Sequence, residues 1–199
     1  VFKGSVWSFT TEPTYYLVPS ASITTTASSV GIPGAIPENT ANGSGLNAQG
    51  QHSINVADMW LSSSTDPNIW IQYELDGEYK LHEMKIWNNN QGVEPLFGVG
   101  AKNITIQTSL DGAAWSVVGD VELAQAPGIP TYEGAPAVDM NGATARYVRI
   151  NIHDNWGGFI PQAGLSEIQL SYVPLAARYE KPASGSANVS PNGQLSWRA

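Results

Sequence analysis

The stretch Ile69-Trp70-Ile71-Gln72-Tyr73-Glu74-Leu75 decides the fold class, because Ile69, Ile71, Tyr73 and Leu75 recur at every second position. Successive side chains of a strand point to opposite sides, so these four residues share one face of an extended chain. The dipeptide Asp76-Gly77 follows directly and favours a turn. We therefore predict a half-buried β-strand over 69–75 that ends in a turn.

Comparable stretches follow at short intervals, and no segment shows the 3.6-residue period of an amphipathic helix. A hairpin turn is predicted at 110–113, because Asp111-Gly112 tolerates a positive φ. Many short strands separated by Gly and Pro turns are typical of two packed antiparallel sheets. We therefore expect an all-β fold, an antiparallel jelly-roll β-sandwich. The further predicted strands are 83–87, 103–108, 115–118, 146–152 and 165–173.

The composition excludes several classes of protein. Charged residues make up 13% of the 199 residues, against ~25% in an average protein, which argues against a helical bundle. The net charge of −8 argues against binding to nucleic acid or to anionic lipid. No apolar run approaches the ~20 residues of a membrane span, so we expect no membrane insertion. Cysteine is absent, which excludes disulfides and fits an extracellular bacterial protein.

Several different short motifs follow one another along the chain. They are Thr24-Thr25-Thr26-Ala27-Ser28-Ser29, Asn42-Gly43-Ser44, Met59-Trp60-Leu61-Ser62, Trp70-Ile71-Gln72-Tyr73-Glu74-Leu75, Ser109-Leu110-Asp111-Gly112-Ala113-Ala114-Trp115, Ala145-Arg146-Tyr147-Val148-Arg149-Ile150 and Gly164-Leu165-Ser166-Glu167-Ile168. Together they resemble the discoidin family, the coagulation factor V/VIII C-domain fold, which includes many bacterial galactose-binding-like carbohydrate-binding modules. The resemblance implies a jelly-roll sandwich of eight strands.

The two ends of the chain are similar to a different kind of module. Pro182 to Trp197 looks like the opening strands of a fibronectin type III-like module, and Gly4 to Thr11 looks like the closing strand of one. We therefore expect the terminal strand of a preceding module over 1–13 and a discoidin-like domain over 14–174. Residues 175–199 are then expected to form a linker and the opening strands of a following module.

A long loop is the first candidate site. Residues 19–58 are poor in bulky apolar side chains, and a loop of this length is usually functional or organised by a metal. The resemblance implies a structural Ca²⁺ there, with a carboxylate from the last strand, and Glu167 matches that carboxylate. The alternative is an ordered loop without metal, with Glu167 hydrogen-bonded to backbone. The remaining expected oxygen donors are Asn39, Asn42, Ser44 and Ser53.

Two other loops carry the parts of a sugar site. Such a site needs an aromatic face for the pyranose ring and planar amides for its hydroxyls. Trp156 is the expected stacking residue, and the expected amides are Asn88, Asn89, Asn90 and Asn155. The alternative is that Trp156 packs over the calcium loop and the asparagines cap turns. The other tryptophans of the strand patterns, expected in the core, are Trp60, Trp70, Trp87 and Trp115.

Catalysis has little support in the sequence. His52, His82 and His153 lie outside any spaced zinc motif, and no nucleophile elbow or phosphate-binding loop occurs. We therefore expect a non-catalytic carbohydrate-binding and adhesion module of a secreted multi-domain bacterial protein. The alternative is a structural unit that pairs with neighbouring copies of itself through terminal strands such as 6–11, which would give head-to-tail filaments.

Overall fold

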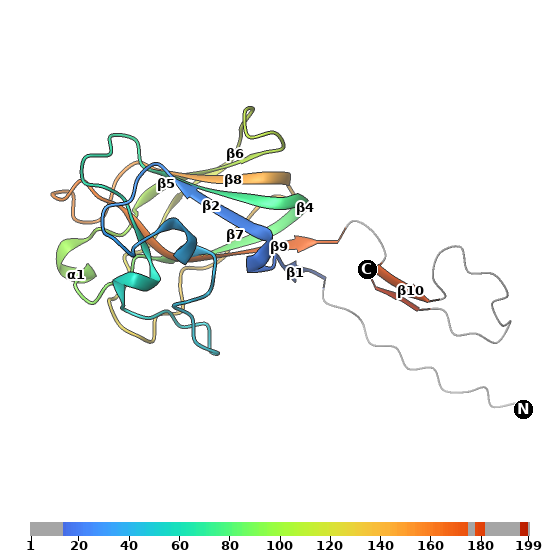
Figure 1. Ribbon diagram of the computed structural model, residues 1–199, viewed down its shortest axis with the longest axis horizontal. Helices are drawn as coiled ribbons and strands as arrows, with labels where there is room; N and C mark the ends of the chain where they lie inside the picture. Colours follow the sequence, from blue (N-terminus) through green and yellow to red (C-terminus); the bar gives the residue numbers. More distant parts are fainter. Residues whose placement is uncertain (1–13, 175–177, 182–195, 199) are drawn as a thin grey trace, which may run out of the picture.

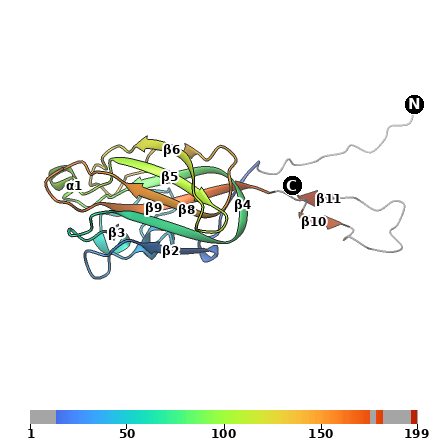
Figure 2. The ribbon, with the colours of Figure 1, turned by 90° about the horizontal axis from the view of Figure 1, so that it is seen from above.

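One long strand joins the two layers of the fold in the computed structural model, which describes residues 14–174, 178–181 and 196–198. This strand, β4 (Trp70–Asn88), pairs in its first half with β2 (Ile23–Ala27) and β8 (Thr144–Ile152). Its second half pairs with β9 (Gly164–Val173) and β7 (Val138–Asp139). Because β4 serves both layers, nine of the described strands form one continuous hydrogen-bonded sheet. Figures 1 and 2 show β4 running between the two layers.

The remaining elements complete a small all-β domain. Every pair of strands in the described ranges is antiparallel, as expected from the sequence. No described helix is long and apolar enough to cross a membrane. The other strands are β1 (Tyr16–Leu17), β3 (Trp60–Leu61), β5 (Asn103–Ser109), β6 (Ser116–Glu122), β10 (Arg178–Lys181) and β11 (Ser196–Arg198). The helical turns are η1 (Ser20–Ser22), η2 (Pro37–Thr40), η3 (Val56–Asp58) and α1 (Glu94–Phe97).

The hydrophobic core lies between the inward faces of the strands, at the positions where the alternation predicts it. Fully or almost fully buried residues include Ile71, Tyr73, Leu75, Ile104, Ile106, Val148, Ile150, Ile168, Leu170 and Tyr172. Trp60 and Trp87 are buried there as expected, and their indole N–H groups donate to the carbonyls of Ser29 and Gly50.

Trp70 and Trp115 are not in the core, which corrects the expectation from the sequence. Both are only half-buried, and the Cζ of Arg149 lies 4.9 Å from the ring centroid of Trp70 and 4.1 Å from that of Trp115. The reason is the strand period, because Trp70 precedes the buried Ile71 and must point to the opposite face.

The predicted turn at Asp76-Gly77 is also wrong. The strand continues through it, and the register between β4 and β8 shifts between Glu74 and Tyr79. Asp76-Gly77 therefore marks an irregularity within β4, whereas Asp111-Gly112 forms a true turn with Gly112 at a φ of 75°.

Two further expectations concern the loop and the ends. Residues 19–58 hold β2 and three short 3₁₀ helices, so this part of the chain is more regular than predicted. Residues 178–181, expected in a linker, form β10 and pair with β11. The predicted strand 6–11 and most of the fibronectin-like segment 182–197 lie outside the described residues.

The two Asp-Gly sites offer a direct test of the β4 geometry. A Cβ added to Gly77 meets no atom within 4 Å, and Gly77 has no positive φ, so Gly77→Ala should leave stability unchanged or raise it by up to about 1 kcal/mol. Gly112→Ala should cost about 1–2 kcal/mol, because its φ of 75° is left-handed. Urea unfolding of both variants measures the difference, and an equal loss in the two would contradict a continuous β4.

Candidate functional site

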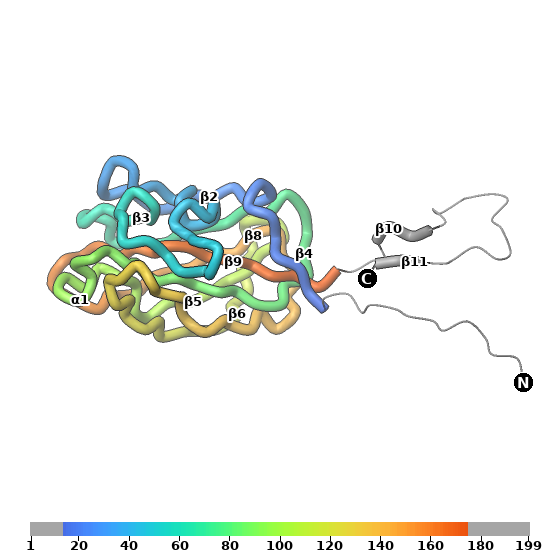
Figure 3. Tube along the Cα trace, turned by 90° about the horizontal axis from the view of Figure 1, so that it is seen from below, coloured from blue at the N-terminus to red at the C-terminus, as the bar shows by residue number. Residues whose placement is uncertain are grey.

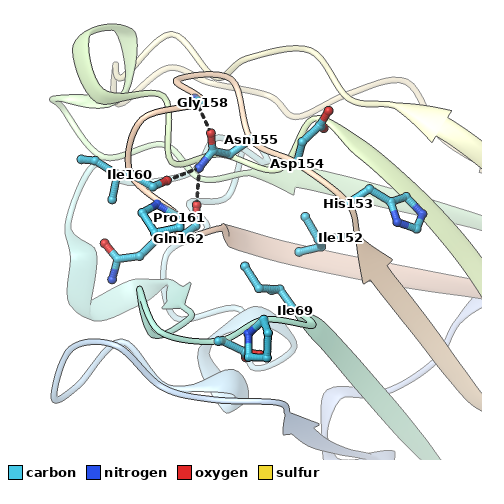
Figure 4. A pocket seen from close by; sticks show the side chains of 11 residues that line it. Ile69, Ile152, His153, Asp154, Asn155, Gly158, Ile160, Pro161 and Gln162 are labelled. Atoms are coloured by element: carbon cyan, nitrogen blue, oxygen red, sulfur yellow. Dashed lines mark hydrogen bonds between the residues drawn. The ribbon is translucent and has the colours of Figure 1, made fainter.

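Loops gather at the end of the sandwich that carries α1, opposite β1 (Figures 1 and 3). The segment after β8 and the segment between β3 and β4 enclose a pocket of about 240 Å³ there (Figure 4). Its lining residues are Asp66, Pro67, Ile69, Ile152, His153, Asp154, Asn155, Gly158, Ile160, Pro161 and Gln162. Its lining therefore combines apolar and polar residues, and no Lys or Arg lines it.

The two carboxylates beside the pocket are fixed by hydrogen bonds. Burial disfavours ionisation of Asp66, but donors at Ser28, Ser29 and the backbone N–H of Asn68 outweigh it and lower the pKa of Asp66. Burial likewise opposes ionisation of Asp154, and the backbone and side-chain N–H groups of Asn103 lower its pKa. Both groups are therefore ionised at neutral pH and accept hydrogen bonds only.

Asn155, expected to contact sugar, organises the loop after β8. Its Nδ2 donates to the carbonyls of Ile160 and Gln162, and its Oδ1 accepts from the backbone N–H of Gly158 (Figure 4). The side chain lines the pocket while its polar atoms bind the loop itself. Asn155 thus sets the shape of the pocket wall.

Trp156 is anchored more firmly than expected for a stacking residue. It is half-buried, its indole N–H donates to the carbonyl of Leu123 at 2.9 Å, and Lys102 Nζ lies 4.8 Å from its ring centroid. The exposed aromatic residue of this loop is Phe159, which is 63% exposed with its ring centroid 6.5 Å from that of Phe97. Two glycines, Gly157 and Gly158, directly precede Phe159. This pair was the feature of the sequence that could have indicated an exposed loop tip at Phe159.

Asn88, Asn89 and Asn90 are completely buried, so the expected row of sugar-binding amides does not reach the surface. Asn88 Nδ2 donates to the carbonyls of Ala101 and Ala124. Asn90 Nδ2 donates to three carbonyls, those of His52, Ser53 and Ile129. Loops from distant parts of the chain enclose the end of β4. The side-chain amides of Asn88 and Asn90 hold those loops together.

Glu167 is a buried carboxylate in contact with the expected calcium loop. It is 2% exposed, and its Oε2 accepts from the backbone N–H of Gly43 at 3.0 Å. Burial raises the pKa of Glu167 to about 8, which this single hydrogen bond only partly offsets. Asn42 and Ser44, the two neighbours of Gly43, are exposed, and Asn42 Oδ1 accepts from the backbone N–H of Ser44 at 2.8 Å.

The other two expected metal donors are engaged elsewhere. Asn39 Nδ2 donates to the carbonyls of Gly34, Ala57 and Met59, and Ser53 Oγ donates to Asp58 Oδ2. No cluster of three or more His, Asp and Glu side chains suited to a metal occurs in the part of the chain that the structure describes. Of the expected donors, the structure therefore brings only the loop 42–44 into a hydrogen bond with Glu167 in the described part of the chain.

A second buried carboxylate, Glu94, was not predicted from the sequence. It is fully buried at the start of α1, and both of its oxygens accept from the backbone N–H of Gly100. Burial raises the pKa of Glu94 to about 7. Its hydrogen bonds close the turn between α1 and β5, so its role in the described structure is to hold that turn.

Comparisons with known proteins agree with this fold. Several solved structures share the fold at low sequence identity. The Clostridium perfringens module CpGH89CBM32-5, in complex with GalNAc-β-1,3-galactose, has a TM-score of 0.59 and 14% identity over 78% of this chain and 99% of that one. The family 32 CBM of C. perfringens NanJ, in complex with galactose, has a TM-score of 0.59 and 13% identity over 79% and 98% of the two chains. A fucolectin from striped bass (Morone saxatilis) has a TM-score of 0.59 and 16% identity over 81% and 48%.

Sequence comparison gives the family directly. A search of curated proteins found no relative of this chain. The family model of the F5/8 type C domain matches residues 24–164, more than half of the chain, and confirms the resemblance found in the sequence motifs. The chain belongs to the F5/8 type C domain family.

Proposed function

We propose that this domain is a non-catalytic carbohydrate-binding module of a secreted, multi-domain bacterial protein. The observation that carries the proposal is the pocket at the loop end, whose lining combines apolar residues with hydrogen-bonding ones. A sugar ring has the matching chemistry, with apolar C–H faces and a rim of hydroxyls. The galactose and GalNAc-β-1,3-galactose bound to two structures of the same fold support this ligand class.

The electrostatics of the pocket favour binding over hydrolysis. A glycoside hydrolase uses two carboxyl groups of which one has a raised pKa and donates a proton. Asp66 and Asp154 both have lowered pKa values, so neither is suited to be that acid. Both are suited to accept hydrogen bonds from sugar hydroxyls, and they disfavour an anionic sugar in this pocket.

Phe159 is the stacking residue in this proposal, in place of Trp156. Its neighbours Gly158 and Ile160 line the pocket, and its own ring is exposed beside Phe97. An aromatic ring presented in this way can cover the apolar face of a pyranose at the pocket entrance. Trp156 instead holds the loop to the strand that ends near Leu123.

Two alanine variants separate these roles. Phe159→Ala should weaken binding of GalNAc-β-1,3-galactose about tenfold while leaving the melting temperature unchanged, because the ring is 63% exposed. Trp156→Ala should lower both affinity and melting temperature, since it removes the hydrogen bond to Leu123. Titration calorimetry and thermal unfolding measure the two effects.

Each other outcome has a clear meaning. If Trp156→Ala abolishes binding at an unchanged melting temperature, Trp156 is the stacking residue and the assignment to Phe159 is wrong. If the unmodified domain binds neither this disaccharide nor any member of a broad glycan panel, the proposed function itself fails.

The same module is proposed to hold Ca²⁺ between Glu167 and the loop at Asn42–Ser44. Glu167 would supply the carboxylate of this site, and the hydrogen bond that it accepts from Gly43 places it against that loop. Calcium prefers carboxylate, amide and carbonyl oxygens, all of which this segment offers. When bound, the ion would compensate the charge of Glu167 and staple the loop to β9.

The pH dependence of stability tests this site. The folded-state pKa of Glu167 is about 8, far above its usual value, so without metal its contribution to stability is full below about pH 4.3 and is lost as pH rises towards 8. Ca²⁺ binds the ionised form, so the increase in melting temperature on adding Ca²⁺ should be larger at pH 8 than at pH 5. Thermal unfolding in Ca²⁺ and in chelator at the two pH values measures it.

Glu94 supplies the matched control, because it is also buried with a raised pKa but lies at α1. Glu167→Gln should remove the Ca²⁺-dependent increase, whereas Glu94→Gln should keep it. An increase that survives in Glu167→Gln, or that is equal at pH 5 and pH 8, would show that Glu167 is not the ligand.

A further inference from the structure

The strands β2, β4, β8, β5 and β6 form one layer of the sandwich (Figure 1). The outer face of this layer carries a group of planar side chains. The strand register places Gln72 of β4, Arg149 of β8 and Gln107 of β5 side by side in one row. Trp70 and Asn151 occupy the next row of the same two strands, β4 and β8. We call the group of Trp70, Gln72, Gln107, Trp115, Arg149 and Asn151 the Arg149 face.

Arg149 has no acidic partner in the described ranges of the chain. Its Nε and Nη2 donate to Gln72 Oε1 at 3.2 and 2.7 Å, and that oxygen is neutral. Arg146, three residues earlier on the same strand, shows the contrast, because its Nη2 lies 2.9 Å from Glu74 Oε1. Burial lowers the pKa of Arg149, and no neighbouring charge contributes to that shift. The guanidinium is therefore partly desolvated without a counter-ion.

The surroundings hold this guanidinium in one place. Arg149 Cζ lies 4.9 Å from the ring centroid of Trp70 and 4.1 Å from that of Trp115, and both contacts are favourable cation–π interactions. Together with the two hydrogen bonds to Gln72, they fix the plane of the guanidinium. A fixed guanidinium loses little conformational entropy when it binds an anion, and its fork of N–H groups matches a carboxylate.

Free hydrogen-bonding groups flank Arg149 on both sides. Gln72 uses only its Oε1, and Gln107 Oε1 accepts from Asn151 Nδ2 at 2.9 Å. Gln72 Nε2, Gln107 Nε2 and Asn151 Oδ1 thus remain available to a ligand in the described structure. Since neighbouring strands lie about 4.8 Å apart, the row from Gln72 to Gln107 spans about 10 Å. That length suits an extended chain of sugars lying across the strands.

We propose that the Arg149 face is a second binding site, which takes an acidic polysaccharide with one uronic acid carboxylate on Arg149. The guanidinium N–H groups that Gln72 does not use donate to the carboxylate, and the flanking amides of Gln72, Gln107 and Asn151 bind sugar hydroxyls. The net charge of −8 opposes a polyanion at long range, so the affinity depends on these local contacts. This site lies on the sheet and does not depend on the loop-end pocket.

The test uses tetragalacturonate as the acidic probe and its fully methyl-esterified form as the neutral counterpart. In ¹⁵N NMR titrations of the intact chain, tetragalacturonate should shift the side-chain amides of Gln72 and Gln107 and the indole N–H signals of Trp70 and Trp115. The neutral tetrasaccharide should bind this face at least tenfold more weakly. These spectra come from the unaltered protein, so they decide the matter even if a variant fails to fold.

Two arginine variants provide the matched comparison. Arg149→Lys keeps the charge but loses the planar fork, and should weaken tetragalacturonate binding at least tenfold. Arg146 lies on the same strand, and its charge is already paired with that of Glu74. Arg146→Lys should therefore leave the affinity unchanged.

Four results would overturn the proposal. They are the absence of any shift up to millimolar probe, shifts confined to the loop around Phe159, equal binding of the neutral tetrasaccharide, and equal loss of affinity in the two variants. Pentaglutamate serves as a further probe. If it shifts the same signals as strongly as tetragalacturonate, the face recognises acidic peptide and the assignment to a polysaccharide is wrong.

Discussion

The whole architecture depends on the pairing of β4 along its length, because this strand belongs to both layers. Its first half places Ile71, Tyr73 and Leu75 in the core and leaves Trp70 and Gln72 on the outer face. A slip of one residue would exchange the two sets, which would bury polar side chains and expose the core. The same register delivers the end of β4 to the loop end of the sandwich, where Asn88 begins the buried amide cluster. The pairing register of β4 therefore determines the positions of the core, the outer face and the loop end together.

At the loop end, hydrogen bonds from buried amide side chains take the place of the backbone hydrogen bonds that join strands in the sheets. Irregular loops cannot pair their backbones regularly, and a buried carbonyl without a donor costs about 1–3 kcal/mol. Asn90 Nδ2 serves three carbonyls with two hydrogens, so at least one hydrogen is shared, and Asn90 Oδ1 also accepts from Gly128 N. Asn155 does the same for the loop after β8. The pocket walls thus rest on side chains whose own polarity is used inside the protein.

The strands and the family could be predicted from the sequence, because alternation and motif order are local properties. The same alternation already implied that Trp70 points away from the core. The expectation that Trp70 is buried rested on the general preference of aromatic residues for the interior, which is the weaker argument. Asn88 and Asn90 could not be placed in this way, since their partners come from other loops of the chain. Asn88 donates to Ala101 and Ala124, and Asn90 donates to His52, Ser53 and Ile129. Asp76-Gly77 and Asp111-Gly112 are the same dipeptide, and only the pairing partners of β4 distinguish strand from turn.

The two buried glutamates show how the same chemistry can serve different purposes. Both carboxylate oxygens of Glu94 accept from the backbone N–H of Gly100 in the turn that Glu94 closes. Gln125, which follows β6, also donates to Glu94, so the carboxylate has donors without any ligand. Glu167 has one backbone donor and lies on β9 opposite Trp87 of β4, where the layers meet the loop 42–44. A proton on Glu167 would remove the free-energy cost of burying its charge but would not link β9 to another segment. A cation would remove the same cost and would also join β9 to the exposed loop 42–44. The proposed Ca²⁺ therefore explains why a carboxylate is useful at a position where a neutral side chain would be easier to bury.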